Sequence, residues 1–124
     1  MITVSALKHE LTSTQDFAKA NLDAFADKFK ENPLYALDWI DKQYIYANRL
    51  GMTATLLGLI EYGENKEGVT EAEIIAEVRK ESQRELFRIA SQCTNKSTGM
   101  GSNMMQAARI EVYARFCEWL SHCN

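Results

Sequence analysis

The chain has 124 residues, of which 46% are hydrophobic and 25% charged, with a formal net charge of −3. This length suffices for one domain with its own core, and a single proline and six glycines argue against disorder and against an all-β chain with many turns. The small net charge by itself indicates neither a nucleic-acid nor a membrane partner. Residues 1–78 hold 7 Lys and Arg against 13 Asp and Glu, whereas residues 79–124 hold 7 against 4. This asymmetry indicates either a partner or the mutual attraction of two halves of one bundle.

The three cysteines, Cys93, Cys117 and Cys123, make an odd number and so do not form a disulfide framework. No basic segment followed by an apolar run marks a secretory signal near residue 1. The longest uncharged run, residues 50–60, is about half of the ~20 residues that span a bilayer. We therefore expect a soluble, cytoplasmic protein with reduced thiols.

The N-terminal third predicts a short helix over residues 5–11 and a longer helix over residues 12–31. Ser5 is a favourable N-cap for the first, and Thr12-x-x-Gln15 has the form of a capping box for the second. Apolar residues then recur at helical spacing at Ala18, Leu22, Phe25 and Phe29. The long helix is expected to end just before the only proline, because the residue preceding a proline is biased away from the helical region.

The stretch from 32 to 63 organises the rest of the chain. Asn32-Pro33 fits an N-cap followed by the first helical position, and Arg49 is the single charge between residues 47 and 60. Very small residues follow one another at helical spacing at Ala47, Gly51, Ala54 and Gly58. Because large apolar groups cover the rest of the circumference, we predict a central, almost wholly apolar helix. Residues 33–62 form either one helix or two helices with a break at Gly51. Substitution of Gly51 or Gly58 by leucine is expected to overpack the fold or a dimer.

The C-terminal half predicts two more helices. Gly63 has the character of a residue just beyond a helix end, and Thr70-x-x-Glu73 is a capping box that starts a helix running to about residue 92. A polar loop over 94–102 leads to a last helix capped by Ser102 or Asn103. Since no alternating strand pattern and no internal repeat is found, residues 1–124 predict a single all-α domain, a helical bundle of four or five helices.

Catalytic and metal-binding patterns are missing from the sequence. The cysteines and histidines lack the spacing of zinc ligands, and no G-x-S-x-G motif is present. The glutamates at 73, 77, 81 and 85 form a ladder, and a basic residue follows each of the last three by three positions, as expected of a solvated helix face. We therefore expect a non-enzymatic protein with no cofactor and no metal.

Two alternative functions follow from the basic region 79–115 and from the loop and helix start over 94–109. The first would bind nucleic acid as a regulator, although the interleaved glutamates would repel phosphate. The second would be an enzyme or a small-ligand or phosphate-binding module, although it lacks the strand and lysine of a phosphate-binding fingerprint. The side chains that would contact an anion or a nucleic acid are Arg84, Arg88, Lys96, Ser102, Asn103 and Arg109.

Protein–protein association is the function that the sequence favours. The candidate interface residues are Tyr35, Trp39, Tyr44, Tyr46, Gly51 and Gly58. Aromatic residues are common anchors of interfaces, and a stripe of small residues lets a second helix approach closely, either within the monomer or from another copy. We expect a homodimer that binds a further protein, as a phage or mobile-element accessory protein does when it inhibits or modulates a host factor.

Overall fold

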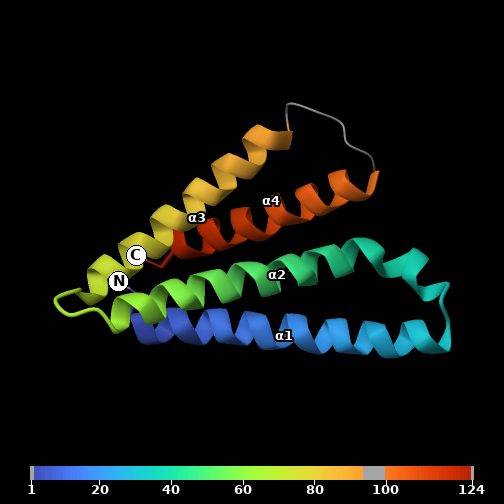
Figure 1. Cartoon of the computed structure of the whole chain (residues 1–124), viewed down its shortest axis with the longest axis horizontal. Helices are drawn as coiled ribbons and strands as arrows, with labels where there is room; N and C mark the ends of the chain where they lie inside the picture. The colour runs from blue at the N-terminus through green and yellow to red at the C-terminus, as the bar shows by residue number, and fades with distance from the viewer. Residues whose placement is uncertain (1, 94–99, 124) are drawn as a thin grey trace.

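The computed structural model describes residues 2–93 and 100–123, apart from the side chains of residues 36, 37, 93 and 100–103. The described residues form four α-helices and no strand: α1 (Val4–Glu31), α2 (Tyr35–Glu64), α3 (Glu71–Cys93) and α4 (Met100–Ser121). They run as two helical hairpins, α1–α2 and α3–α4, and the two chain ends lie together at one end of the bundle (Figure 1). The predicted all-α class and the predicted number of helices agree with this architecture.

α1 is one continuous helix, whereas the sequence predicted two. Thr3 caps it, because its Oγ1 accepts a hydrogen bond from the Ala6 N–H at 3.1 Å. The predicted boundary at Thr12 lies inside the helix. Leu7 and Leu11 are both fully buried, so the first turns present the same inner face as the turns that follow. No glycine or proline interrupts this segment, and the helix continues through it.

α2 is also a single helix and passes through Gly51 without a break. It begins at Tyr35, two residues later than the predicted first position at Pro33. Asn32 still satisfies a donor in the turn, since its Oδ1 accepts a hydrogen bond from the Leu34 N–H at 3.1 Å. The turn between α1 and α2 is therefore short and internally hydrogen-bonded.

α3 begins at the predicted capping box. The Glu73 N–H donates to Thr70 Oγ1 at 3.2 Å, and the Thr70 N–H donates to the Glu73 carboxylate at 3.3 Å. This reciprocal pair confirms the predicted start of the helix. α4 begins at Met100, before both of the predicted caps, Ser102 and Asn103. Residues 94–99 of the predicted loop lie outside the described part of the chain.

The core is centred near the end of the bundle where the chain termini lie. The largest fully buried apolar side chains come from all four helices: Leu7, Leu11, Leu56, Ile60, Val78, Ile89 and Leu120. Two polar contacts hold the start of α1 there, because the Val4 N–H donates to Glu71 Oε1 at 2.6 Å and Lys8 pairs with Glu64 at 2.9 Å. From this end α3 diverges from α4, and the far end of the α1–α2 hairpin extends beyond α4 (Figure 1).

The expectation of an almost wholly apolar central helix is not confirmed for α2. It contacts each of the other three helices through one side, where Met52, Thr53, Leu56 and Ile60 are buried. The small residues lie on the opposite side and are exposed: Ala47, Gly51, Ala54 and Gly58. Apart from the adjoining backbone of α2 itself, a Cβ atom on Gly51 or Gly58 would have no described heavy atom within 4 Å. The expectation that a larger side chain overpacks the monomer at these positions is therefore wrong.

Candidate protein-interaction site

A groove runs between α1 and α4, over the surface of α2. α1 and α4 each pack against α2, which lies between them in Figure 1, and their described residues make no direct backbone contact with each other. The groove has a volume of about 390 Å³, near the lower end of the roughly 300–1,000 Å³ typical of binding pockets. Along α1 it extends from Glu10 to Phe17, which is about 10 Å at 1.5 Å per residue. This length corresponds to two turns of a helix.

The floor of the groove is apolar. Its lining consists of Ile45 and Met52 from α2 and of Val112, Phe116 and Trp119 from α4. Phe17 stands at the α1 edge with 58% of its surface exposed, and its ring meets that of Tyr46 edge-on at 6.1 Å between centroids. An exposed aromatic ring next to an apolar floor is typical of a surface that a ligand or another protein covers.

Four charged side chains also line the groove, and two of them have no ionic partner among the described residues. On α4, Arg115 Nε donates to Glu111 Oε1 at 3.0 Å, so this pair is neutralised within the helix. Arg49 of α2 lies over the ring of Tyr46, with 5.5 Å between Cζ and the ring centroid. Neither Arg49 nor Glu10 of α1 forms an ion pair with a described residue. Two unpaired charges of opposite sign therefore line one groove.

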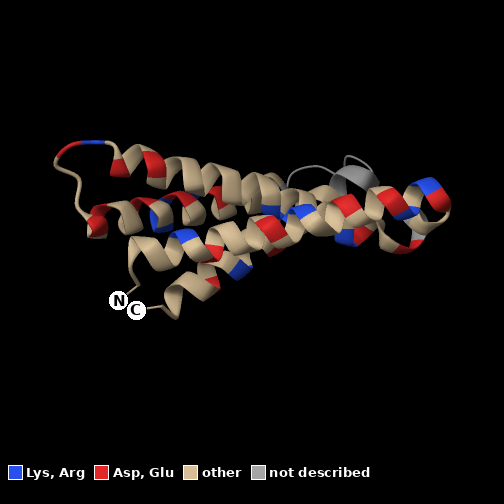
Figure 2. Ribbon diagram, turned by 90° about the horizontal axis from the view of Figure 1, so that it is seen from below, with Lys and Arg blue, Asp and Glu red and all other residues tan. Residues whose placement is uncertain are grey.

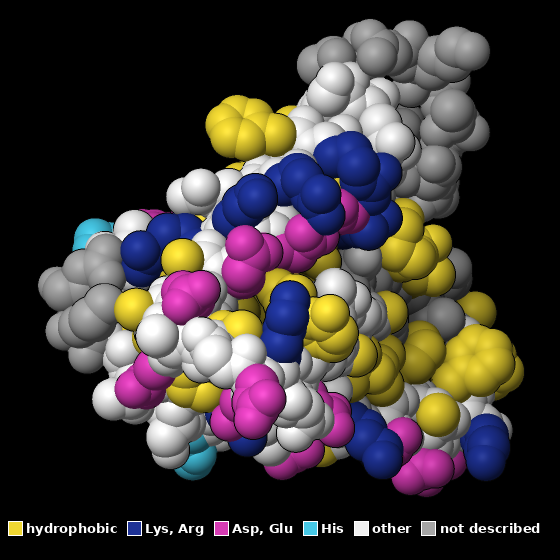
Figure 3. Space-filling model, turned by 60° about the vertical axis from the view of Figure 1, so that its left-hand side comes forward, with side chains coloured by type: hydrophobic (Ala, Val, Ile, Leu, Met, Phe, Trp, Pro, Cys, Tyr) yellow, Lys and Arg dark blue, Asp and Glu magenta, His cyan; other side chains and the backbone are white. Residues whose placement is uncertain are grey.

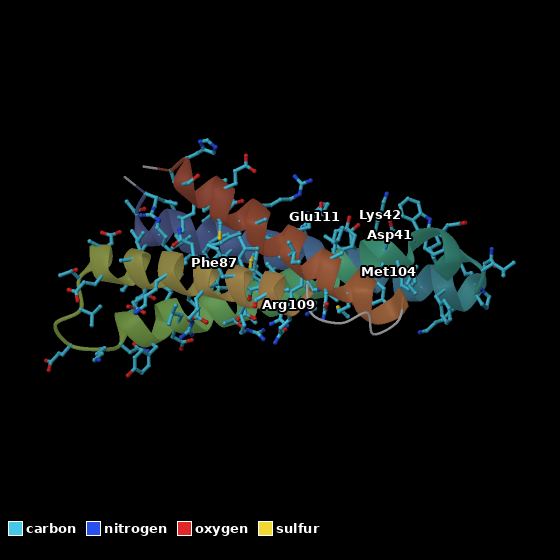
Figure 4. All side chains as sticks on the ribbon, turned by 90° about the horizontal axis from the view of Figure 1, so that it is seen from above. Asp41, Lys42, Phe87, Met104, Arg109 and Glu111 are labelled. Carbon is cyan, nitrogen blue, oxygen red and sulfur yellow. The ribbon has the colours of Figure 1, made fainter. Side chains whose placement is uncertain are left out.

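The predicted interface aromatics do not form one surface. Tyr35 and Trp39 lie near the free end of the α1–α2 hairpin, in a chain of ring contacts with Phe25 and Phe29 whose centroid distances lie between 5.7 and 6.2 Å. Lys42 Nζ lies 3.9 Å from the centroid of the Trp39 ring. In Figure 4 this part of α2, marked by Lys42, lies near the start of α4. These rings therefore pack on one another across the end of the hairpin.

Three other predicted residues lie on what we call the α2 outer face. It consists of Ile40, Tyr44, Ala47, Gly51, Ala54, Gly58 and Tyr62. It runs the length from Ile40 to Tyr62, about 33 Å along the helix, without a charged member. Tyr62 is 67% exposed, Ile40 is 43% exposed and Tyr44 is half-buried. Tyr46 lies outside this face and contacts Phe17 of α1.

The predicted basic contacts on α3 and α4 are paired with glutamates. Arg84 pairs with Glu81, Arg88 pairs with Glu85, and Arg109 of α4 donates to Glu85 Oε1 at 2.6 Å. The hydrogen bond from Arg88 is the main cause that holds the pKa of Glu85 below its usual value. Figure 2 shows acidic and basic residues interleaved along the helices, and Figure 3 shows basic side chains against acidic ones on one face. These arginines therefore offer little unneutralised charge to a phosphate.

The predicted anion site lies largely outside the described structure. Lys96 falls in residues 94–99, and Ser102 and Asn103 lie in the first turn of α4 with side chains that are not described. Arg109, the remaining member, is held by α3. Within the described residues no three potential metal ligands of the His, Cys, Asp or Glu type lie together. None of the described helices has the length and hydropathy needed to cross a membrane.

No protein-family model matches the chain, and neither does any curated protein or solved structure. Sequence reasoning missed the groove because its two edges come from helices that are distant in sequence. One residue pointed to the groove. Arg49 is the only charge between residues 47 and 60, and a charged side chain in an apolar run is uncommon unless it has a structural or binding role.

Proposed function

We propose that this chain is a non-enzymatic protein that acts by protein–protein association, with an amphipathic helix of the partner protein docked in the α1–α4 groove. The observation that carries the proposal is that α1 and α4 both lie against α2 without close backbone contact between their described parts, and that an apolar groove lined by all three helices lies open between them. Amphipathic helices bind such grooves through apolar side chains at i, i+3 or i+4, and i+7. Seven residues of helix span the same distance as Glu10 to Phe17.

A second copy of the chain is a further partner that we propose, at the α2 outer face. In an antiparallel pairing centred on Gly51, Tyr44 of one copy lies opposite Gly58 of the second copy, because both are equally far from Gly51 in sequence. The same symmetry places Ile40 opposite Tyr62. In this pairing the tyrosine at 44 packs against a glycine, and the two large side chains at 40 and 62 pack against each other. Such self-complementary packing across an uncharged face is expected of a two-fold interface.

Nucleic-acid binding has weaker support. Arg84, Arg88 and Arg109 are held in ion pairs, and those pairs would have to be broken before a phosphate gained their full charge. The groove, in contrast, presents apolar surface that is already open. A protein partner is therefore the better match to the described surface.

A helical probe peptide tests the proposal. The peptide carries leucines at i, i+4 and i+7, and a scrambled peptide of the same composition serves as the control. Binding is measured by fluorescence anisotropy to the wild-type chain, to Phe17→Glu in the groove, and to Phe87→Glu. Phe87 is 76% exposed on α3 (Figure 4) and does not line the groove, which makes it a matched exposed phenylalanine.

The proposal predicts that the wild-type chain and Phe87→Glu bind the helical peptide equally. Phe17→Glu should bind it at least about tenfold more weakly, the loss expected when an apolar anchor becomes a charge. No preference of the wild-type chain for the helical over the scrambled peptide would overturn the proposal. Equal weakening by the two variants would do so as well.

A further inference from the structure

The unpaired charges in the α1–α4 groove indicate which charged residues the partner helix carries. This inference rests on the proposed function. We infer that the docked helix carries an aspartate or glutamate within its apolar stripe, and that this carboxylate pairs with Arg49. The partner is thus an amphipathic helix with one acidic residue facing the α2 floor.

Arg49 is positioned by the floor of the groove itself. It lies on α2 between the lining residues Ile45 and Met52, and it is half-buried. The ring of Tyr46 lies under its guanidinium group, 5.5 Å from centroid to Cζ. This distance is within cation–π range, and the planar guanidinium keeps N–H donors that can bind a carboxylate in a bidentate manner.

The acids that line the same groove do not neutralise Arg49. Glu111 is held by Arg115 at 3.0 Å, and Glu10 of α1 forms no ion pair with any described residue, Arg49 included. A half-buried arginine beside apolar side chains gains most from a carboxylate when a ligand excludes the water around it. The floor is therefore complementary to a ligand that supplies a negative charge and apolar groups together.

Glu10 favours a helix over a free fatty acid as that ligand. A fatty acid also combines apolar groups with a carboxylate, yet it offers no base to the Glu10 carboxylate at the α1 edge of the groove. A peptide helix can place a lysine or arginine on its flank toward Glu10 while its acid faces Arg49. Complementary charges of both signs then set the specificity of docking.

Three probe peptides test this inference. They share the leucine pattern of the helical peptide and differ at one position in the centre of the stripe, which holds Glu, Gln or Lys. A central position faces the floor whichever way the helix runs along the groove. Affinities are measured for the wild-type chain, for Arg49→Gln, and for Arg49→Lys, which keeps the charge. A thermal melt of each variant verifies that it is folded, and decanoate is titrated separately.

The wild-type chain should bind the Glu peptide at least about tenfold more tightly than the Lys peptide, since a desolvated charge pair is replaced by a like-charge contact. Arg49→Gln should lose this preference, and Arg49→Lys should retain part of it. Equal affinity of the three peptides would overturn the inference while leaving docking in the groove intact. Decanoate that binds more tightly than the Glu peptide would overturn the helix as occupant. If no peptide binds, the proposed function fails too.

Discussion

Gly63 of α2 and Ile74 of α3 approach each other so closely that a Cβ atom on Gly63 would lie 2.8 Å from Cγ1 of Ile74. The sequence predicted Gly63 as the residue just after a helix, but it lies inside the last turn of α2 and is half-buried. Its hydrogen side chain lets the start of α3 pack directly on α2. The absence of a Cβ atom at Gly63 therefore helps to set how closely the α3–α4 hairpin packs on the α1–α2 hairpin.

Gly63→Ala should lower the free energy of unfolding by about 1–3 kcal/mol, because the added methyl group overpacks the contact with Ile74. In the matched variant Gly51→Ala, the new methyl group meets no described atom within 4 Å beyond the adjoining backbone of α2, and the chain should gain up to about 1 kcal/mol of helix propensity. Urea denaturation at low protein concentration measures both. Changes of the same sign in the two variants would contradict the packing described.

Thr70→Ala should destabilise the chain by about 1 kcal/mol, because it removes the acceptor that caps α3. Thr12→Ala is the informative comparison, since the sequence suggested a cap there and the structure places it within α1. It should be neutral or stabilising by up to about 0.5 kcal/mol, as alanine is the better helix former. A loss at Thr12 as large as that at Thr70 would show that α1 is broken near residue 12.

Glu85 should make stability depend on pH. Hydrogen bonding by Arg88 lowers its pKa in the folded chain, so its ion pairs contribute fully above the usual carboxyl pKa and the contribution is lost as the pH falls through the lowered value. Glu85→Gln should cost about 1–2 kcal/mol at neutral pH. The difference from wild type should shrink as the pH falls below the usual carboxyl pKa and through the lowered pKa of Glu85. Glu118→Gln removes an exposed carboxylate on α4 and serves as the control. It should change neither the free energy of unfolding at neutral pH nor its dependence on pH. A cost of Glu85→Gln that does not vary with pH would contradict the role of the Glu85 ion pairs.

The α2 outer face predicts a dimer that a charge disrupts. Multi-angle light scattering should give twice the monomer mass for the wild-type chain, and Gly51→Glu should give the monomer because it places two carboxylates at the two-fold axis. Ala20→Glu, on an exposed position of α1, should remain a dimer. A monomeric wild-type chain would contradict the dimer, and an unchanged dimer mass for Gly51→Glu would contradict its placement on the α2 outer face. Neither result bears on docking in the groove.

Local signals explain which features the sequence predicted. The capping box at Thr70 and the end of α1 before Pro33 depend on residues adjacent in the chain, and both agree with the structure. The orientation of α2 was not predictable, because small residues such as Gly51 and Gly58 permit close packing whether they point inward or outward. Only the positions of the other helices determine which side is covered.

The groove could not be predicted from the sequence for a related reason. Phe17 reads as one more aromatic residue on an amphipathic helix, and Trp119 reads as a core residue of the last helix. Their common site exists because α1 and α4 lie on α2 with a gap between them, and no spacing within either helix encodes that relation. Arg49 alone stood out, as the single charge in an apolar run.

Intermolecular nuclear Overhauser effects between the leucine methyl groups of the helical peptide and the two tryptophan indoles test docking in the groove most directly. Trp119 lines the groove, whereas Trp39 lies near the free end of the α1–α2 hairpin, so each indole reports on a different surface. Docking as proposed predicts contacts to Trp119 and none to Trp39. Contacts to Trp39 alone, or to neither indole at saturating peptide, would contradict it.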